Sequence, residues 1–302
     1  MSMINEITLI AVVVAIACAL PGVFLVLRGA TMVSDAITHT VLLGIVLAFF
    51  ITQDLNSPLL MIGATLVGLA TVWLIETIQR SNLVSNDAAI GIVFPLFFSI
   101  AIILITFYAG DVHLDEDAVL MGELAFAPFR RLDLWGYDLG PQSLWVMFII
   151  LIINSVFIFF FYKELKVTTF DPAFAAAIGF SPVVIHYALM TLVSLTAVGA
   201  YDSVGSILIV GFMVGPALSG YILTHSLNKM IGITVIMAII NSVSGVRLAF
   251  FFDTTIAGMI AVVTGSTTLL ILIFSPKKGL FQHQISQNRA RRNLNKEIEK
   301  MA

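Results

Sequence analysis

The sequence predicts an all-α polytopic membrane protein with about nine transmembrane helices, within a range of eight to ten. Of its 302 residues, 59% are hydrophobic and only 11% are charged, and the mean hydropathy is +1.05. A water-soluble domain carries more charge and fewer unbroken apolar runs. Several apolar runs here approach the roughly 20 residues that cross a bilayer, and the alternating short segments of an outer-membrane barrel do not appear.

The expected spans follow one another along most of the chain. The first run has an acidic flank at Glu6 and no basic N-terminal region, so we interpret it as a true span and not as a signal peptide. Proline and glycine inside several runs are tolerated where neighbouring helices or a water-lined path satisfy the freed backbone groups. The predicted spans are residues 7–27, 36–52, 57–78, 88–109, 142–162, 183–200, 203–224, 230–248 and 254–275.

Lysine and arginine are distributed unequally between the two sides that nine spans define. With the N-terminus outside, twelve of the fifteen basic residues fall inside, and only Arg130, Arg131 and Arg247 fall outside. The excess of positive charge on the cytoplasmic side of membrane proteins therefore predicts an outside N-terminus and a cytoplasmic C-terminus. Residues 1–276 form the predicted membrane domain, and residues 277–302 form a polar, basic cytoplasmic tail in solvent or on anionic lipid.

The longest outside segment, residues 110–142, is acidic. Its side chains could raise the local cation concentration. A solvated loop without a binding role is the simpler interpretation, and both stay open. The residues concerned are Asp111, His113, Asp115, Glu116, Asp117 and Glu123.

Asp35 and His39 are the candidate metal ligands. They are four residues apart at the start of a predicted span, which places them on one face of a helix. A carboxylate and an imidazole suit zinc, manganese or iron(II) better than copper(I), which prefers sulfur. A divalent ion needs about four ligands, so the others must come from water, other helices or a second copy of the chain. Alternatively, Ser34 or Asp35 caps the helix and His39 forms a local hydrogen bond.

Enzymatic chemistry has little support in the sequence. Cys18 is the only cysteine, so one chain forms neither a disulfide framework nor a thiolate metal cluster. The HExxH motif of metalloproteases and the GxxxxGK[ST] motif of ATPases are both absent. Glu76 and Arg80 are spaced for a local ion pair, and we expect His186 to be satisfied locally as well. We therefore expect a protein in membrane lipid that is not an enzyme, with no permanently bound cofactor and no nucleic-acid partner.

A short capped helix is predicted between two spans, within residues 168–182 on the basic side. Asp171 suits the N-cap and Pro172 the first helical position. Gly179 suits the position after the helix end, and Pro182 prevents continuation. The alanines between them make the helix thin enough to dock into a cleft of a partner, although an ordinary connecting helix has the same pattern.

Four stretches in this order resemble the permease subunits of bacterial ABC importers for manganese, zinc and iron(II). The first, LRGATMVSDAITHTVLLGIVLAFF at residues 27–50, matches the family at Arg28, Asp35, Ala36, Thr38, His39 and Gly44. The others are NDAAIGIVFPLFF at 86–98, KELKVTTFDPAFAAAIGFSP at 163–182 and YDSVGSILIVGFMVGPALSGYILT at 201–224. The sequence departs from the family pattern at some positions, such as Leu43, where the family has proline. These changes affect helix kinks near the translocation path.

The resemblance implies the fold of a type II ABC importer-like permease in the cytoplasmic (inner) membrane of a bacterium. In the family, two permease chains, identical or related, form the path, and ABC ATPase subunits on the cytoplasmic side bind and hydrolyse ATP. An extracellular or periplasmic metal-binding protein delivers the ion, and the acidic segment at residues 110–142 could contact that protein. Asp35 and His39 would then face the path, and two copies would supply four ligands. The segment that would dock on the ATPase includes Phe170, Asp171, Pro172, Ala175 and Gly179.

The expected function is the permease subunit of an ATP-driven importer of divalent transition-metal ions, with manganese favoured over zinc or iron(II). The first alternative is a gradient-driven secondary metal transporter in which Asp35 and His39 relay protons. It predicts transport by this chain alone. The second alternative is an ABC importer of a small metal complex such as a siderophore or cobalamin, whose conduit would not need the Asp-His pair.

Overall fold

The computed structural model describes residues 3–54, 57–108, 124–134 and 137–275. In these ranges, nine helical segments are long and apolar enough to cross a membrane, which confirms the predicted fold class. The long helices are α1 (Met3–Arg28), α2 (Thr31–Thr52), α3 (Pro58–Arg80), α4 (Asn86–Tyr108), α6 (Gln142–Phe160), α9 (Pro182–Leu223), α10 (Leu227–Phe252) and α11 (Ile256–Phe274).

Helix α9 contains two of the nine spans. They are Pro182–Tyr201 and Ser203–Leu223, and the backbone leaves helical geometry at Gly205, where φ is +72°. A residue with a Cβ atom adopts this φ only with strain, so the glycine permits the break. The chain therefore turns within a few residues where the sequence also predicted the end of one span and the start of the next.

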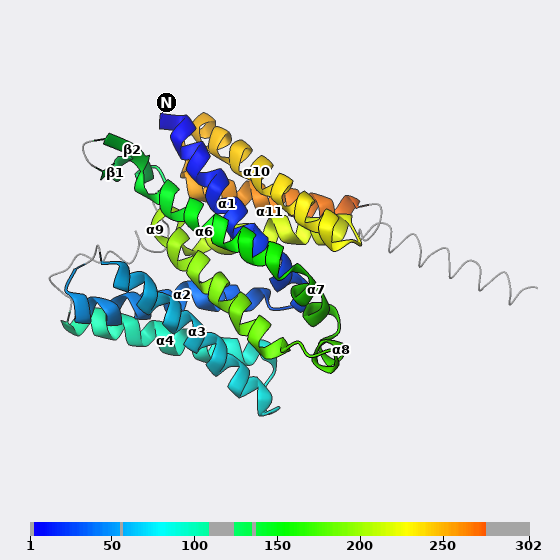
Figure 1. Ribbon diagram of the computed structural model, residues 1–302. Helices are drawn as coiled ribbons and strands as arrows, with labels where there is room; N and C mark the ends of the chain where they lie inside the picture. The colour runs from blue at the N-terminus through cyan, green and yellow to red at the C-terminus, as the bar shows by residue number, and fades with distance from the viewer. Residues whose placement is uncertain (1–2, 55–56, 109–123, 135–136, 276–302) are drawn as a thin grey trace, which may run out of the picture.

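Helices α1 and α9 form the centre of the bundle (Figure 1). Helices α2, α3 and α4 pack together on one side of them, and α10 and α11 pack together on the other. One end of the bundle, called the hairpin end here, carries the antiparallel strands β1 (Arg131–Leu134) and β2 (Tyr137–Pro141) after the short helix η1 (Ala127–Phe129). The opposite end, called the α8 end, carries α7 (Tyr162–Phe170) and α8 (Pro172–Ala177).

Two glycines let helices touch through their backbones. A Cβ atom on Gly22 of α1 would lie 2.0 Å from the carbonyl oxygen of Met213 on α9. A Cβ atom on Gly44 of α2 would lie 2.4 Å from the Cα atom of Ala64 on α3. Small residues at helix crossings are typical of membrane bundles, where close backbone approach replaces the hydrophobic effect as the source of packing energy. The position of α2 is therefore set closely by α3.

Buried polar side chains add hydrogen bonds between the helices. Asn154 on α6 donates through Nδ2 to the carbonyl oxygen of Ala17 at 3.0 Å and to Oγ1 of Thr196 at 2.8 Å. Thr71 on α3 donates to Oγ1 of Thr40 on α2 at 2.9 Å. Such bonds contribute about 0.6 kcal/mol each in membrane proteins, so they orient the helices more than they stabilise the bundle.

Several boundaries differ from those predicted. Helix α2 begins at Thr31 and not near residue 36, because Gly29, with φ +65°, ends α1 and leaves a very short connection. Helix α7 was not expected, since its polar sequence lacks a periodic apolar face. Residues 124–134 and 137–141 of the predicted outside segment form η1 and the hairpin, whereas its acidic residues up to Glu123 and the basic tail lie outside the described ranges.

Candidate functional site

Asp35 and His39 share one face of α2, as predicted. Nε2 of His39 lies 3.6 Å from Oδ1 of Asp35. They are the fifth and ninth residues of the helix, so they lie about 6 Å and 12 Å along its axis from Thr31. The pair is therefore close to the α8 end of the bundle and within the membrane-spanning part of α2.

The carboxylate of Asp35 is unusually open for a group within a span. Its side chain is 44% exposed in the isolated chain, and that of His39 is 21% exposed. An ionisable side chain that faces lipid costs a few kcal/mol, so such groups usually face a water-filled path or another protein. The exposed side of α2 at Asp35 is thus better suited to a path or a protein neighbour than to lipid.

The alternative in which Ser34 or Asp35 caps the helix is wrong. The N-cap residue of α2 is Ala30, which has no capping side chain. The hydroxyl of Ser34 donates to the carbonyl oxygen of Thr31 at 2.6 Å, so it bonds back within the first turn. The carboxylate of Asp35 has no N-cap role and faces His39.

Helix α4 holds the imidazole ring of His39 from the side. The ring centroid of Phe94 lies 4.9 Å from that of His39, and the centroid of Phe98 lies 6.1 Å away with its ring nearly perpendicular. Both phenylalanines belong to the stretch at residues 86–98. These contacts restrict the orientation of the imidazole while leaving Asp35 open.

The described residues of one chain supply only two ligands at this place. Among residues 3–54, 57–108, 124–134 and 137–275, no group of three or more His, Cys, Asp or Glu side chains is arranged to hold a metal ion. A divalent transition metal needs about four ligands. Transient binding at Asp35 and His39 therefore requires water or ligands from another chain.

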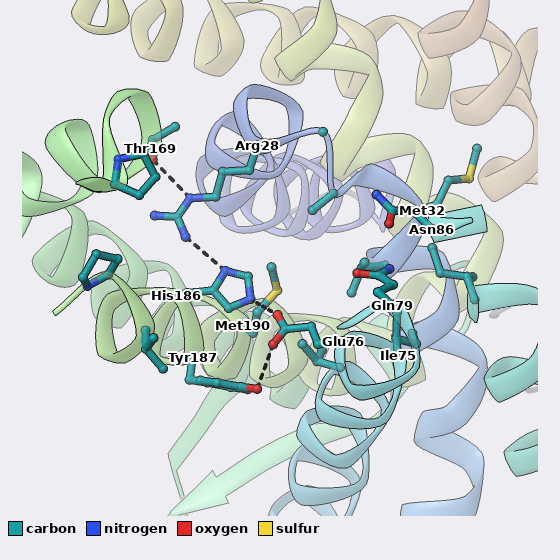
Figure 2. A pocket seen from close by; sticks show the side chains of 18 of the residues that line it. Arg28, Met32, Ile75, Glu76, Gln79, Asn86, Thr169, His186, Tyr187 and Met190 are labelled. Carbon is teal, nitrogen blue, oxygen red and sulfur yellow. Dashed lines mark hydrogen bonds and ion pairs between the residues drawn. The ribbon is translucent and has the colours of Figure 1, made fainter. Parts of the chain in front are cut away.

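A second polar group lies nearby at the α8 end, in a cleft of about 720 Å³ (Figure 2). The cleft is lined by Arg28 of α1, Glu76 of α3, and His186 and Tyr187 of α9. Met32 and Val33 of α2 and Ile90 of α4 also line it, so the cleft comes within about one helical turn of Asp35.

The polar side chains in the cleft form one hydrogen-bonded chain. The guanidinium of Arg28 can only donate, so Nδ1 of His186, 3.2 Å from it, accepts. Nε2 of His186 then carries the proton and donates to Oε1 of Glu76, whose Oε2 accepts from the hydroxyl of Tyr187 at 2.8 Å. Burial lowers the pKa of Arg28, but arginine starts so high that it stays charged.

These contacts correct the expectation for His186. The local pair is present, with Arg80 lying 3.9 Å from Glu76, but the partners of His186 come from α1 and α3. Spacing along the chain identifies partners within one helix and carries no signal for a contact between helices. The charged residues near three different helix ends were the only sign that such a group could form.

The segment around α8 has the local structure that the sequence predicts. Asp171 caps the helix, its Oδ1 accepting from the backbone N–H of Phe174 at 2.9 Å, and Pro172 is the first helical residue. Gly179 has φ +94°, and the N–H groups of Gly179 and Phe180 donate to the carbonyls of Ala176 and Ala175. This is the Schellman arrangement of a glycine-terminated helix. Ala175 faces inward and is buried.

The surface around α8 is apolar. Phe170 is 60% exposed and Phe174 is 54% exposed, and Ile178 is exposed as well. Phe174 is in α8, Phe170 and Ile178 flank it, and all three lie outside the spans, so lipid does not cover them in the way that it covers the sides of the bundle. Large exposed apolar side chains in such a place indicate an interaction surface.

Comparison with known proteins identifies the family. The sequence profile of the ABC 3 transport family matches residues 1–275. The chain is 44% identical over 278 residues to the zinc transport system membrane protein TroD of Treponema pallidum, covering 92% of this chain and 76% of that protein. It is 39% identical over 274 residues to the manganese transport system membrane protein MntD of Bacillus subtilis, covering 91% and 92%.

A solved structure supports the same assignment. The fold matches PsaBC from Streptococcus pneumoniae in complex with Fab with a TM-score of 0.76 and 29% identity, covering 92% of this chain and 94% of that chain. An inward-facing metal-chelate type ABC transporter matches with a TM-score of 0.63, and at 19% identity it supports the fold alone. The chain therefore belongs to the ABC 3 transport family, as a multi-pass membrane permease of a metal ABC importer and not an enzyme.

Proposed function

We propose that this permease carries Mn²⁺ into a bacterial cell, and that Asp35 and His39 contact the ion on its way. The observation that carries the proposal is the half-exposed carboxylate of Asp35 within a span, paired with His39 on the outer face of α2. A cation that loses part of its water on entering the membrane needs such compensating charge and ligands.

A second permease chain would complete the ligand set. Two copies related by a two-fold axis would each present one carboxylate and one imidazole, giving four ligands around the axis. The second chain can be identical or related, because only the Asp and His on its α2 are required. The open face of α2 supports this arrangement, since a neighbouring chain would cover a carboxylate that otherwise faces lipid.

The ligand chemistry favours Mn²⁺, Zn²⁺ and Fe²⁺ as a class. Carboxylate and imidazole bind first-row divalent ions in the Irving–Williams order, so affinity at this pair cannot by itself prefer manganese. We favour manganese because a relative that spans nearly the full length of both chains has manganese in its name. Zinc is the main competitor, as the name of TroD indicates.

ATP hydrolysis would take place on a separate ATPase subunit that docks on α8. The exposed Phe174 in this well-capped helix and the exposed Phe170 just before it support a docking surface of this kind. The α8 end would then be cytoplasmic and the hairpin end would face outside, in the cytoplasmic membrane. An extracellular or periplasmic metal-binding protein would deliver the ion to the hairpin end.

The test is uptake of metal into proteoliposomes that contain this chain with its ATPase subunit and delivery protein. We expect uptake of Mn²⁺ that requires ATP, with Zn²⁺ and Fe²⁺ competing less well at equal free concentration. Preference for Zn²⁺ or Fe²⁺ would replace manganese as the cargo and leave the rest of the proposal intact. Uptake by the permease alone, driven by a proton gradient, would favour the secondary transporter instead.

A further inference from the structure

Arg28, His186 and Glu76 form a chain of hydrogen bonds that joins the ends of three helices, and we call it the polar bridge. Arg28 ends α1, His186 lies in the second turn of α9, and Glu76 lies in the last turns of α3 (Figure 2). Beyond these three helices, Nε of Arg28 donates to Oγ1 of Thr169 at 3.1 Å, and its terminal nitrogen donates to Oγ1 of Thr168 at 3.2 Å. Both threonines belong to α7, which leads directly into α8.

We propose that the polar bridge positions α3 relative to the α7–α8 segment, so that movement of that segment is transmitted to the helix that carries Asp35 and His39. The inference rests on the proposed function, because it takes α8 as the docking point of the ATPase. It adds Arg28, His186 and Glu76 as positioning residues that touch neither the ion nor ATP.

Continuous contacts lead from the polar bridge to Asp35 and His39. Glu76 is on α3, and α3 packs along α2 through the close approach of Gly44 to Ala64 and the hydrogen bond from Thr71 to Thr40. Because these two helices touch through their backbones, α2 follows a shift of α3. A displacement of α7 can therefore reach Asp35 through side chains and backbones that are all in contact.

The cleft beside the bridge leaves room for such a shift. At about 720 Å³, it is lined by residues from the ends of α1, α3, α4, α7 and α9. In this region the helices are joined by directional hydrogen bonds in addition to apolar packing. Hydrogen bonds of this kind transmit a small displacement when they hold, and permit separation when they break.

A metal-binding role for the same residues does not fit the geometry. A metal ion on His186 would need the lone pair of Nε2, but the contact of Nδ1 with Arg28 places the proton on Nε2. The guanidinium of Arg28 is 3.2 Å from the imidazole, and Arg80 is 3.9 Å from the carboxylate of Glu76. These two positive charges disfavour a divalent cation at the bridge.

The experiment measures uptake of Mn²⁺ and hydrolysis of ATP in the same proteoliposomes, with the complete transporter. We expect His186→Phe, which keeps a ring but removes both hydrogen bonds, to lower the number of ions taken up per ATP by about tenfold while hydrolysis continues. His186→Gln restores one acceptor and one donor, so we expect it to return the ratio to within about threefold of the wild type.

Tyr162→Phe is the matched control. It removes the hydrogen bond from the hydroxyl of Tyr162 to Asn228, which also starts on α7 but leads to α10 and not to α3. We expect it to leave the ratio of uptake to hydrolysis unchanged. If His186→Phe fails to assemble, the isosteric double variant Thr168→Val with Thr169→Val weakens the bridge at its α7 end and should lower the same ratio.

The outcomes separate the bridge from the proposed function. Wild-type uptake that depends on ATP, together with an unchanged ratio in His186→Phe and in the threonine double variant, would overturn the bridge alone. A loss of uptake and hydrolysis in equal proportion, without recovery in His186→Gln, would also overturn it in favour of a purely structural role. Absence of ATP-dependent uptake of Mn²⁺, Zn²⁺ and Fe²⁺ by the wild type would overturn both.

Discussion

The carboxylate of Asp35 is the group on which transport should depend most directly. Asp35→Asn keeps the shape of the side chain but removes the charge and one of the proposed metal ligands. We expect uptake of Mn²⁺ to fall at least about tenfold. Mutation of a residue that only hydrogen-bonds to a metal ligand already lowers metal affinity about 10- to 100-fold, and loss of a ligand should cost at least as much. His39→Gln should behave similarly, and the amount of assembled transporter in the membrane should stay the same for both.

Asp54→Asn is the control for this measurement. Asp54 is an exposed acidic residue just beyond the other end of α2, so the same chemical change is made far from the pair. We expect wild-type uptake from it. Normal uptake in both Asp35→Asn and His39→Gln would show that the pair lies off the path.

At the residue scale, sequence spacing predicted what lies within a helix and missed what lies between helices. The shared face of Asp35 and His39 follows directly from their separation by four residues. The cap on α8 follows from the Asp171-Pro172 dipeptide. By contrast, the partners of His186 and the aromatic neighbours of His39 come from helices distant in the chain, and no spacing rule reaches them.

At the scale of the elements, the crossing of α1 with α9 leaves no space for a side chain at Gly22. Gly22→Ala places a Cβ atom against the backbone of Met213, which cannot move aside as a flexible side chain can. We expect the free energy of unfolding to fall by about 1–3 kcal/mol, the usual range for overpacking, or by more. Thermal unfolding can be followed in detergent by the reaction of Cys18, which is buried in the folded state, with a fluorogenic maleimide.

Gly265→Ala on α11 provides the comparison. A Cβ atom there meets nothing within 4 Å, so only the helix propensity changes. Alanine is favoured over glycine in a helix by about 0.5–1 kcal/mol, and we therefore expect an unchanged or slightly raised melting temperature. Equal melting temperatures for the two variants would mean that the helices separate easily at Gly22.

The short helix α8 should depend on its cap. Asp171→Ala removes the acceptor for the N–H of Phe174, and the loss of an N-cap costs about 1 kcal/mol. In a helix of only 6 residues, this is enough to increase opening severalfold. We expect faster hydrogen exchange in α8 and weaker association of the ATPase subunit, measured by co-purification at increasing detergent.

Ser226→Ala makes the same change at a helix that should not contact the ATPase through its cap. Ser226 accepts from the N–H of Lys229 at the start of α10, which has 26 residues and is held along its length by its neighbours. We expect the association to be normal in this variant. If Asp171→Ala and Ser226→Ala weaken the association of the ATPase subunit equally, the effect is a general one on this end of the bundle and not specific to α8.

The number and order of the spans were predictable because apolar runs of membrane length are long and unambiguous. All nine are present in the described residues, and the two halves of α9 occur where the sequence placed two separate spans. Helix α7 was missed for the opposite reason, since its nine residues, Tyr162–Phe170, are polar and short. Contacts of α7 with the bundle support its helical conformation, and the sequence pattern of α7 does not reveal these contacts.

At the scale of the whole molecule, the two ends of the bundle have the loops and charges that orient it in a membrane. The positive-inside rule predicts a cytoplasmic α8 end and an outside hairpin end. Residues at opposite ends of α10 offer a direct test, because His225 and Thr254 are both exposed and lie just before and just after the helix. The single native cysteine, Cys18, is buried and should not react in the folded protein.

We expect Thr254→Cys to react with a membrane-impermeant maleimide added to intact cells, and His225→Cys to react only after the membrane is opened. Because the two sites are joined by one span, they must lie on opposite sides, and labelling of both in intact cells would indicate leaky membranes. Labelling of His225→Cys alone would invert the topology. It would place α8 outside the cell, where no ATP is available, and the proposed docking of an ATPase there would be wrong.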